Sequence, residues 1–101
     1  MDKQGKQTKI GTPLFDGLNY AFWSIRIKVY LQAQGANVWR MIVNTYVIPA
    51  NPPTNARSIE RKNYEDNSKA MNTILSSLTE TVFIKVMHCE TMKEIWDKLV
   101  G

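Results

Sequence analysis

The chain has 101 residues and a formal net charge of +4, and 44% of its residues are hydrophobic. This length supports one folded domain, and this hydrophobic content excludes a largely disordered chain. No apolar run approaches the roughly 20 residues of a membrane helix, and because the first ten residues are polar we expect no secretory signal. Because the single cysteine, Cys89, cannot form an internal disulfide, we expect a cytoplasmic or nuclear protein.

Positive charge is concentrated at the start of the chain, where Lys3, Lys6 and Lys9 outnumber one aspartate. We expect residues 1–10 to form a flexible basic tail and residues 11–101 to form a single helical lobe. Three lysines attract phosphate groups weakly and in a salt-sensitive way. These lysines are therefore candidate RNA contacts, although a solubilising tail is the favoured interpretation.

The first predicted helix spans about residues 20–34, after a segment in which Pro13 and Gly17 oppose helix formation. Asn19 is predicted to cap this helix by accepting a backbone N–H with its side chain. Gly35 is placed to end it with a positive φ. The helix is apolar around most of its circumference, so we expect it to be central and to pack on more than one neighbour.

One charged residue, Arg26, falls inside this apolar arc, between Phe22, Tyr30 and Ala33 on a helical wheel. A charge cannot remain buried there without a partner. Two interpretations are equally supported. The guanidinium either reaches water over its aliphatic stem or pairs with a carboxylate of another helix.

Three more helical segments precede residue 90. A short helix is predicted over about residues 36–45, and the prolines after it predict an exposed loop over residues 47–55. The longest helix is predicted over about residues 56–78, and a short one over about residues 79–87. The buried stripe of the longest helix is predicted to consist of Tyr64, Asn67, Met71, Ile74, Leu75 and Leu78. Its first half is charged, with Glu65 spaced to attract Lys69.

A fifth amphipathic helix is predicted from about residue 92, because Thr91-Met92-Lys93-Glu94 is a capping box. The sequence is still apolar near its end, so we expect the natural chain to continue. The helical segments and the lack of any alternating strand pattern predict an all-α fold, a compact bundle of about five helices. The predicted core consists of Phe15, Tyr20, Trp23, Ile27, Leu31, Ile74, Leu78, Phe83, Ile95, Trp96 and Leu99.

No constellation in the sequence indicates catalysis. His88 and Cys89 are adjacent, and neighbouring residues on one short loop cannot provide a zinc site or a nucleophile with its base. No glycine-rich phosphate loop is present, and Glu65 and Asp66 point apart on one helix. We therefore expect a protein that is not an enzyme and that uses no metal, cofactor or small-molecule substrate.

Three motifs resemble a known family. The pattern F-x-G-x-N-Y-x-x-W at residues 15–23 resembles the signature that opens the Gag region of copia-type LTR retrotransposon polyproteins, the plant-type Gag polypeptide family. The patterns A-M-x-x-I-x-x-S-L at residues 70–78 and T-x-x-E-I-W-D-x-L at residues 91–99 resemble later motifs of that family. The resemblance covers about residues 12–100. It departs from the family at Met92, where alanine is usual, and the family's zinc knuckle is not present.

This resemblance implies a capsid-like N-terminal lobe, a structural module that assembles particles through contacts between copies. The signature residues carry no catalytic group and are interpreted as structural. They are Phe15, Gly17, Asn19, Tyr20, Trp23, Leu78, Trp96 and Leu99. Two alternatives stay open: a domesticated Gag lobe that binds a peptide or protein in a helix groove, and a weak RNA binder that uses the basic tail.

The partners implied are other Gag subunits, with no membrane partner. We expect self-association to be weak and concentration-dependent, because no heptad seam or long apolar stripe is predicted to remain once the core is filled. The candidate contact surfaces are the charged first half of the longest helix, with Arg57, Glu60, Arg61 and Glu65, and the exposed loop around residues 49–53. That these are simply solvated surfaces is an alternative of nearly equal weight.

Overall fold

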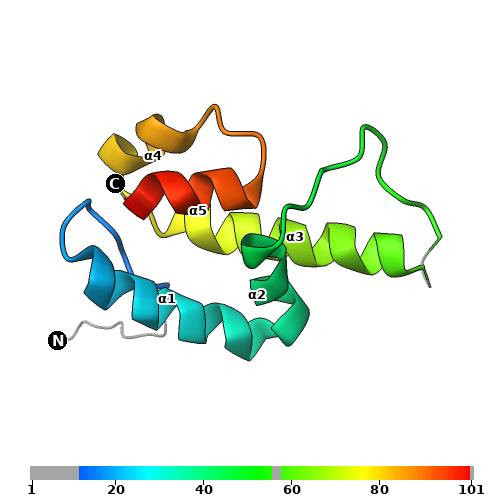
Figure 1. The fold of residues 1–101 in the computed structure, drawn as a ribbon, viewed down its shortest axis with the longest axis horizontal. Coiled ribbons are helices and arrows are strands. Elements are labelled where there is room, and N and C mark those ends of the chain that lie inside the picture. Colours follow the sequence, from blue (N-terminus) through cyan, green and yellow to red (C-terminus); the bar gives the residue numbers. More distant parts are fainter. Residues whose placement is uncertain (1–11, 56–57, 101) are drawn as a thin grey trace, which may run out of the picture.

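A computed structural model describes residues 12–55 and 58–100 of the chain, and these residues form an all-α fold (Figure 1). The helices of this part are α1 (Tyr20–Gln34), α2 (Ala36–Val43), α3 (Ile59–Ser76), α4 (Glu80–Val86) and α5 (Met92–Val100). The same residues contain no strand, only an isolated bridge between Phe15 and Leu78. The predicted helical bundle is therefore confirmed.

Some predictions concern other parts of the chain. The predicted basic tail, with Lys3, Lys6 and Lys9, lies outside the described residues, and so does Arg57. Within the described residues, no helix combines the length and the apolar character needed to cross a membrane.

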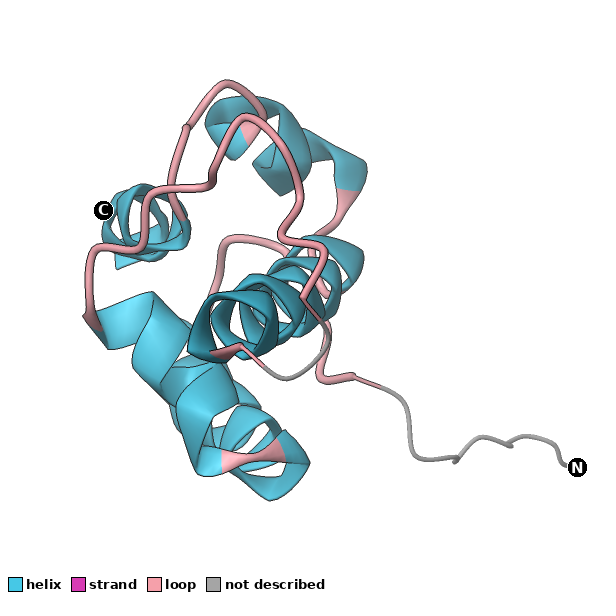
Figure 2. Ribbon diagram, turned by 90° about the vertical axis from the view of Figure 1, so that its right-hand side faces the viewer, coloured by secondary structure: helices cyan, strands magenta, loops and turns pink. Residues whose placement is uncertain are grey.

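The helices surround one core, to which every helix contributes. α2 packs on both α1 and α3 and also contacts α5, and α3 runs along the longest axis of the molecule (Figure 1). Seen from the side, the helices enclose a common interior (Figure 2). The buried apolar residues are Phe15, Trp23, Ile27, Leu31, Val38, Met41, Ile42, Ala70, Ile74, Leu78, Val82, Val86, Met92, Ile95 and Leu99.

Most of the predicted core is buried in the structure. Tyr20, Phe83 and Trp96 are exceptions, because they are only partly buried and pack against the core at its edge. Aromatic side chains with a polar tip, such as tyrosine and tryptophan, often occupy such positions, where one end is dry and the other reaches water.

Backbone conformation sets the start of α1, without a side-chain cap. Asn19 occupies the N-cap position with φ 54° and ψ 48°, and its side chain makes no cap hydrogen bond. The predicted capping role of Asn19 is therefore wrong, and asparagine suits the position because it tolerates the left-handed region. Gly17 has a φ of 100°, as the tight turn requires. Gly35 ends α1 with a φ of 147°, as predicted.

Contacts at both ends make α3 shorter than predicted. It begins at Ile59 because the Ser58 hydroxyl caps it, accepting the N–H of Arg61 at 3.0 Å. It ends before Ser77, whose hydroxyl donates to the carbonyl of Ile74 at 2.6 Å. Serine competes with the helical backbone for such bonds, which is why it is common at helix ends.

The buried face of α3 also differs from the predicted stripe. Asn67 is buried as predicted, but Asp66 and Thr73 are buried too. The predicted members that are only partly buried are Tyr64, Met71 and Leu75. The face is rotated because α2 packs on α3 and supplies polar partners, for example the side-chain amide of Asn37, which donates to Asp66 at 2.8 Å.

Candidate interaction surfaces

The first sequence motif forms an aromatic cluster with α5. The rings of Phe15 and Trp23 stack with their centroids 4.6 Å apart, and Tyr20 lies edge-on to Phe15 at 6.0 Å. The ring of Trp96 lies 5.7 Å from that of Trp23 and 6.2 Å from that of Tyr20. Aromatic residues of the first and third motifs therefore pack together.

The segment before α1 is tied to the junction of α3 and α4 by main-chain hydrogen bonds. The N–H of Phe15 donates to the carbonyl of Ser77 at 2.7 Å, and the N–H of Thr79 donates to the carbonyl of Phe15 at 3.1 Å. The indole N–H of Trp23 donates to the carbonyl of Pro13 at 3.0 Å. These bonds join the first motif to the end of the second, so the signature residues hold the fold together.

The third motif starts α5 with the predicted capping box. The Thr91 hydroxyl accepts the N–H of Glu94 at 3.1 Å, and the Glu94 carboxylate accepts the N–H groups of Thr91 at 3.3 Å and Glu90 at 2.8 Å. This reciprocal pattern satisfies donors that the first turn of a helix otherwise leaves free. The capping box is confirmed.

The outer face of α1 is apolar and exposed. Phe22, Ile25 and Val29 expose 64%, 65% and 59% of their surfaces, and Leu18, just before the helix, exposes 70%. We call these four residues the α1 stripe. The spacing of Phe22, Ile25 and Val29 places them along one side of the helix, away from the residues of α1 that enter the core, and Leu18 belongs to the turn before the helix. The expectation that no apolar stripe remains after the core is filled is therefore wrong.

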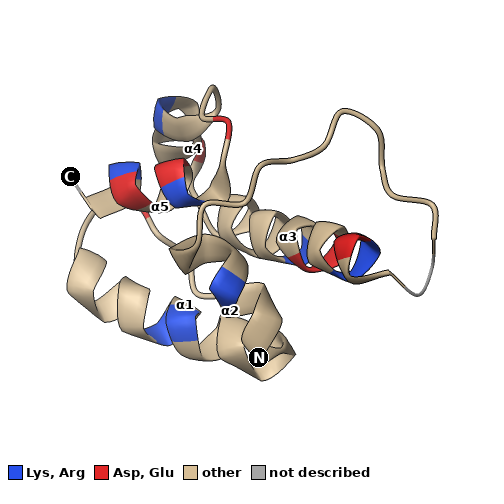
Figure 3. Cartoon of the chain, turned by 45° about the vertical axis from the view of Figure 1, so that its right-hand side comes forward, with Lys and Arg blue, Asp and Glu red and all other residues tan. Residues whose placement is uncertain are grey.

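Positive charge flanks the α1 stripe. Arg26 is exposed, and its guanidinium carbon lies 5.3 Å from the centroid of the Phe22 ring, within the range of a cation–π contact. None of the ion pairs among the described residues involves Arg26, so its side chain reaches water, the first of the two interpretations. The Lys28 ammonium lies 5.4 Å from the Trp39 ring. Figure 3 shows α1 with positive residues and no negative ones.

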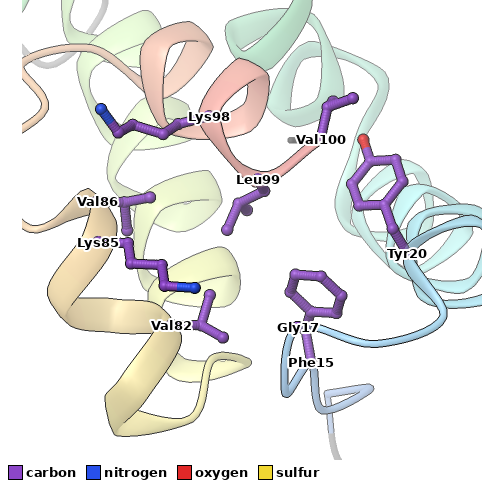
Figure 4. Close-up of a pocket in the computed structure, with 9 residues that line it drawn as sticks. All are labelled: Phe15, Gly17, Tyr20, Val82, Lys85, Val86, Lys98, Leu99 and Val100. Carbon is purple, nitrogen blue, oxygen red and sulfur yellow. The ribbon is translucent and has the colours of Figure 1, made fainter.

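A pocket of about 450 Å³ lies where the segment before α1 meets α4 and α5 (Figure 4). We call it the end pocket. Its lining is formed by Phe15, Gly17, Tyr20, Val82, Lys85, Val86, Lys98, Leu99 and Val100. Among these residues are two lysines and no carboxylate. Burial, and then the negative charge of Asp97, raise the pKa of the Tyr20 hydroxyl, which therefore stays protonated.

The candidate contact surface at the start of α3 contains one ion pair. Arg61 and Glu65 are 2.9 Å apart, so Glu65 pairs with Arg61 and the predicted attraction to Lys69 is wrong. Lys69 instead lies 3.9 Å from Asp66. Glu60 is exposed and takes part in none of the ion pairs among the described residues.

One carboxylate in α3, that of Asp66, is buried and well partnered. Its Oδ2 accepts from the amide of Asn37 at 2.8 Å and from the ammonium of Lys62 at 3.0 Å. Burial alone raises the pKa of Asp66, but these hydrogen bonds and the charges of Lys62 and Lys69 outweigh it and lower the pKa below the ordinary value. This carboxylate therefore joins α2 to α3 as a charged, satisfied group.

The adjacent His88 and Cys89 follow α4, with the histidine exposed and the thiol half-buried. Residues 12–55 and 58–100 contain no cluster of three or more histidine, cysteine or carboxylate side chains with the geometry to hold a metal. The surfaces that stand out are therefore the α1 stripe and the end pocket.

Comparisons of the chain with family models, curated proteins and solved structures find no match.

Proposed function

We propose that the chain is a structural assembly module of the copia-type Gag class, which associates with further copies of itself. The observation that carries this proposal is the α1 stripe. Exposed apolar side chains that gather on one face of a small domain often mark a site of contact with another protein surface. The motif resemblance gives the class, and the packing of the three motifs on one another supports a structural role for them.

The spacing within the α1 stripe favours a second copy as the partner. The intervals from Leu18 to Phe22, Ile25 and Val29 are four, three and four residues, and this order reads the same in both directions. In a two-fold antiparallel pair of α1 helices that run from Tyr20 to Gln34, Phe22 then faces Ile25 of the other copy, and Val29 faces the segment before the other helix, to which Leu18 belongs. A two-fold contact requires such self-complementarity.

The charges beside the stripe are compatible with this pairing. In the same antiparallel register, Arg26 faces Ala21 of the second copy, and Lys28 faces Asn19. No two positive charges therefore lie directly opposite each other, which would cost binding energy. The carboxylates of the described residues all lie outside α1, so no ion pair across α1 strengthens the dimer.

The dimer is weak. One helix face on each copy supplies less area than the roughly 1,200–2,000 Å² of a stable protein complex. We therefore expect a dissociation constant between micromolar and millimolar, so that assembly depends on local concentration or on additional contacts.

Sedimentation over a range from micromolar to millimolar protein tests the proposal. Ile25→Glu places two charges in the centre of the pairing and is expected to weaken association at least about tenfold. Ile84→Glu is the matched control, because Ile84 is 54% exposed on α4, outside the stripe. The proposal fails if the unsubstituted chain stays monomeric at millimolar concentration, or if Ile25→Glu and Ile84→Glu associate equally well.

A further inference from the structure

We infer that the end pocket receives the first residues of α3 from another copy of the chain, with Ile59 in the pocket and Glu60 against its two lysines. This inference rests on the proposed self-association and adds a second, different contact to it. The α1 pairing uses the same surface on both copies, whereas this contact joins one end of a molecule to the other end of the next.

The end pocket suits an apolar side chain that has a carboxylate beside it. Its floor is apolar, with Phe15, Val82 and Leu99 among the lining residues, and Figure 4 shows these side chains directed into the same space. Lys85 extends toward this space, whereas Lys98 lines the pocket with its stem and directs its ammonium group away from it (Figure 4), and no lining residue is acidic. The volume of about 450 Å³ exceeds that of one isoleucine side chain and lies within the range of ordinary binding pockets.

The start of α3 carries the complementary group. Ile59 exposes 77% of its surface, more than any other large hydrophobic residue among those described. The next residue, Glu60, is exposed and has no ion-pair partner among the described residues. An exposed isoleucine followed by a carboxylate that has no ion-pair partner among the described residues complements an apolar pocket whose lining includes two lysines and no acidic residue.

The two surfaces lie too far apart to meet within one molecule. α3 runs along the longest axis, and its first residues lie at the end away from α4, α5 and the segment before α1 (Figure 1). This axis is 46 Å long. The contact is therefore between copies and head-to-tail, and repeated contacts of this kind generate rings or open chains.

Charge reversal tests this contact in chains that carry Ile25→Glu, which removes the α1 pairing. Glu60→Lys alone, and Lys85→Glu with Lys98→Glu, are each expected to weaken the residual association at least about tenfold, because like charges then meet. An equimolar mixture of the two variants restores opposite charges at every contact between unlike variants. Sedimentation should show the mixture associating as strongly as the Ile25→Glu parent. Glu90→Lys, a reversal at an exposed loop residue, is the matched control and should change nothing.

Methyl NMR spectra identify the occupant. When the unlabelled Ile25→Glu parent is added to a labelled copy, the methyl signals of Val82, Val86 and Leu99 should shift. When an unlabelled Ile59→Ser variant of that parent is added instead, these signals should not shift. The inference is overturned if the mixture stays monomeric, if the Ile25→Glu parent does not associate at all, or if an unrelated acidic peptide shifts these signals while a second copy does not. Any of these results can occur while the unsubstituted chain still associates through α1, so the proposed function would stand.

Discussion

Two residues turn the backbone sharply before α1. Gly17 and Asn19 both have positive φ, 100° and 54°, a region that costs most residues about 1–2 kcal/mol. The turn lets Phe15 bond to the junction of α3 and α4 while Trp23 enters the core. Gly17 and Asn19 therefore stabilise this turn through the backbone conformations that they can adopt.

Substitution of Asn19 separates this backbone role from a capping role. Asn19→Gly should change the free energy of unfolding by less than about 0.5 kcal/mol, because glycine adopts positive φ without strain. Asn19→Val should lower it by about 1–2 kcal/mol, because a β-branched residue does not tolerate the left-handed region. Urea denaturation measures both values. Equal losses for the two variants would show that the asparagine side chain itself is needed.

The two tryptophans of the aromatic cluster should differ in importance. Trp23 is 2% exposed and its indole donates a hydrogen bond, so Trp23→Ala should cost about 3–5 kcal/mol. Trp96 lies at the edge of the core, and Trp96→Ala should cost less. Thermal or urea unfolding of both variants checks the order. A smaller loss for Trp23→Ala than for Trp96→Ala would contradict the burial seen here.

At the scale of elements, helices whose ends depend on local signals agree best with the sequence. α1 has the predicted bounds, since Gly35 ends it, and α5 starts at its capping box. α3 agrees less well, because weak local signals at Ser58 and Ser77 set its ends and a main-chain bond from the distant Phe15 also holds the chain where the helix ends. Such partners lie far away in sequence, so periodicity does not reveal them.

The surfaces were less predictable than the helices. α1 is apolar on two faces, and nothing local distinguishes the face that is buried from the one that is exposed. The end pocket brings together residues from both ends of the chain, such as Phe15 and Leu99. By contrast, the sequence already includes Glu60 among four candidate contact residues, because it lies in the charged first half of the longest helix.

The contact of α2 with α3 through Asp66 should make stability depend on pH. The pKa of this carboxyl is lower in the folded protein than its ordinary value of 3.8. Its contribution is therefore complete above about pH 4 and is lost as the pH falls through the lower, folded pKa. Asp66→Asn should reduce the free energy of unfolding by about 1–3 kcal/mol at pH 7.

Comparison of urea unfolding at pH 7 and pH 3 tests this linkage. The difference between the unsubstituted chain and Asp66→Asn should shrink at pH 3, because at that pH the unfolded chain binds a proton at this carboxyl more readily than the folded protein does. Asp97→Asn is a suitable control, since Asp97 is 59% exposed in its pair with Lys93, and exposed pairs contribute little. A difference for Asp66→Asn that is the same at both pH values would contradict the linkage.

At the scale of the whole molecule, the two proposed contacts have different symmetries. Pairing of α1 helices is two-fold and stops at a dimer, whereas the head-to-tail contact can repeat. Together they would link dimers into extended assemblies, although each contact alone is weak. Multiple weak contacts increase the overall strength of an assembly without any single tight interface.

The bond between Phe15 and the junction of α3 and α4 also has a consequence for synthesis. Phe15 leaves the ribosome well before its partners Ser77 and Thr79, which are far away in sequence, and Trp96 follows later still. A domain closed by contacts between distant residues folds more slowly than one built from local contacts. The aromatic side chains of the first motif must therefore stay exposed until almost the whole domain has been translated, and during that interval a nascent chain is open to chaperones and to other nascent copies.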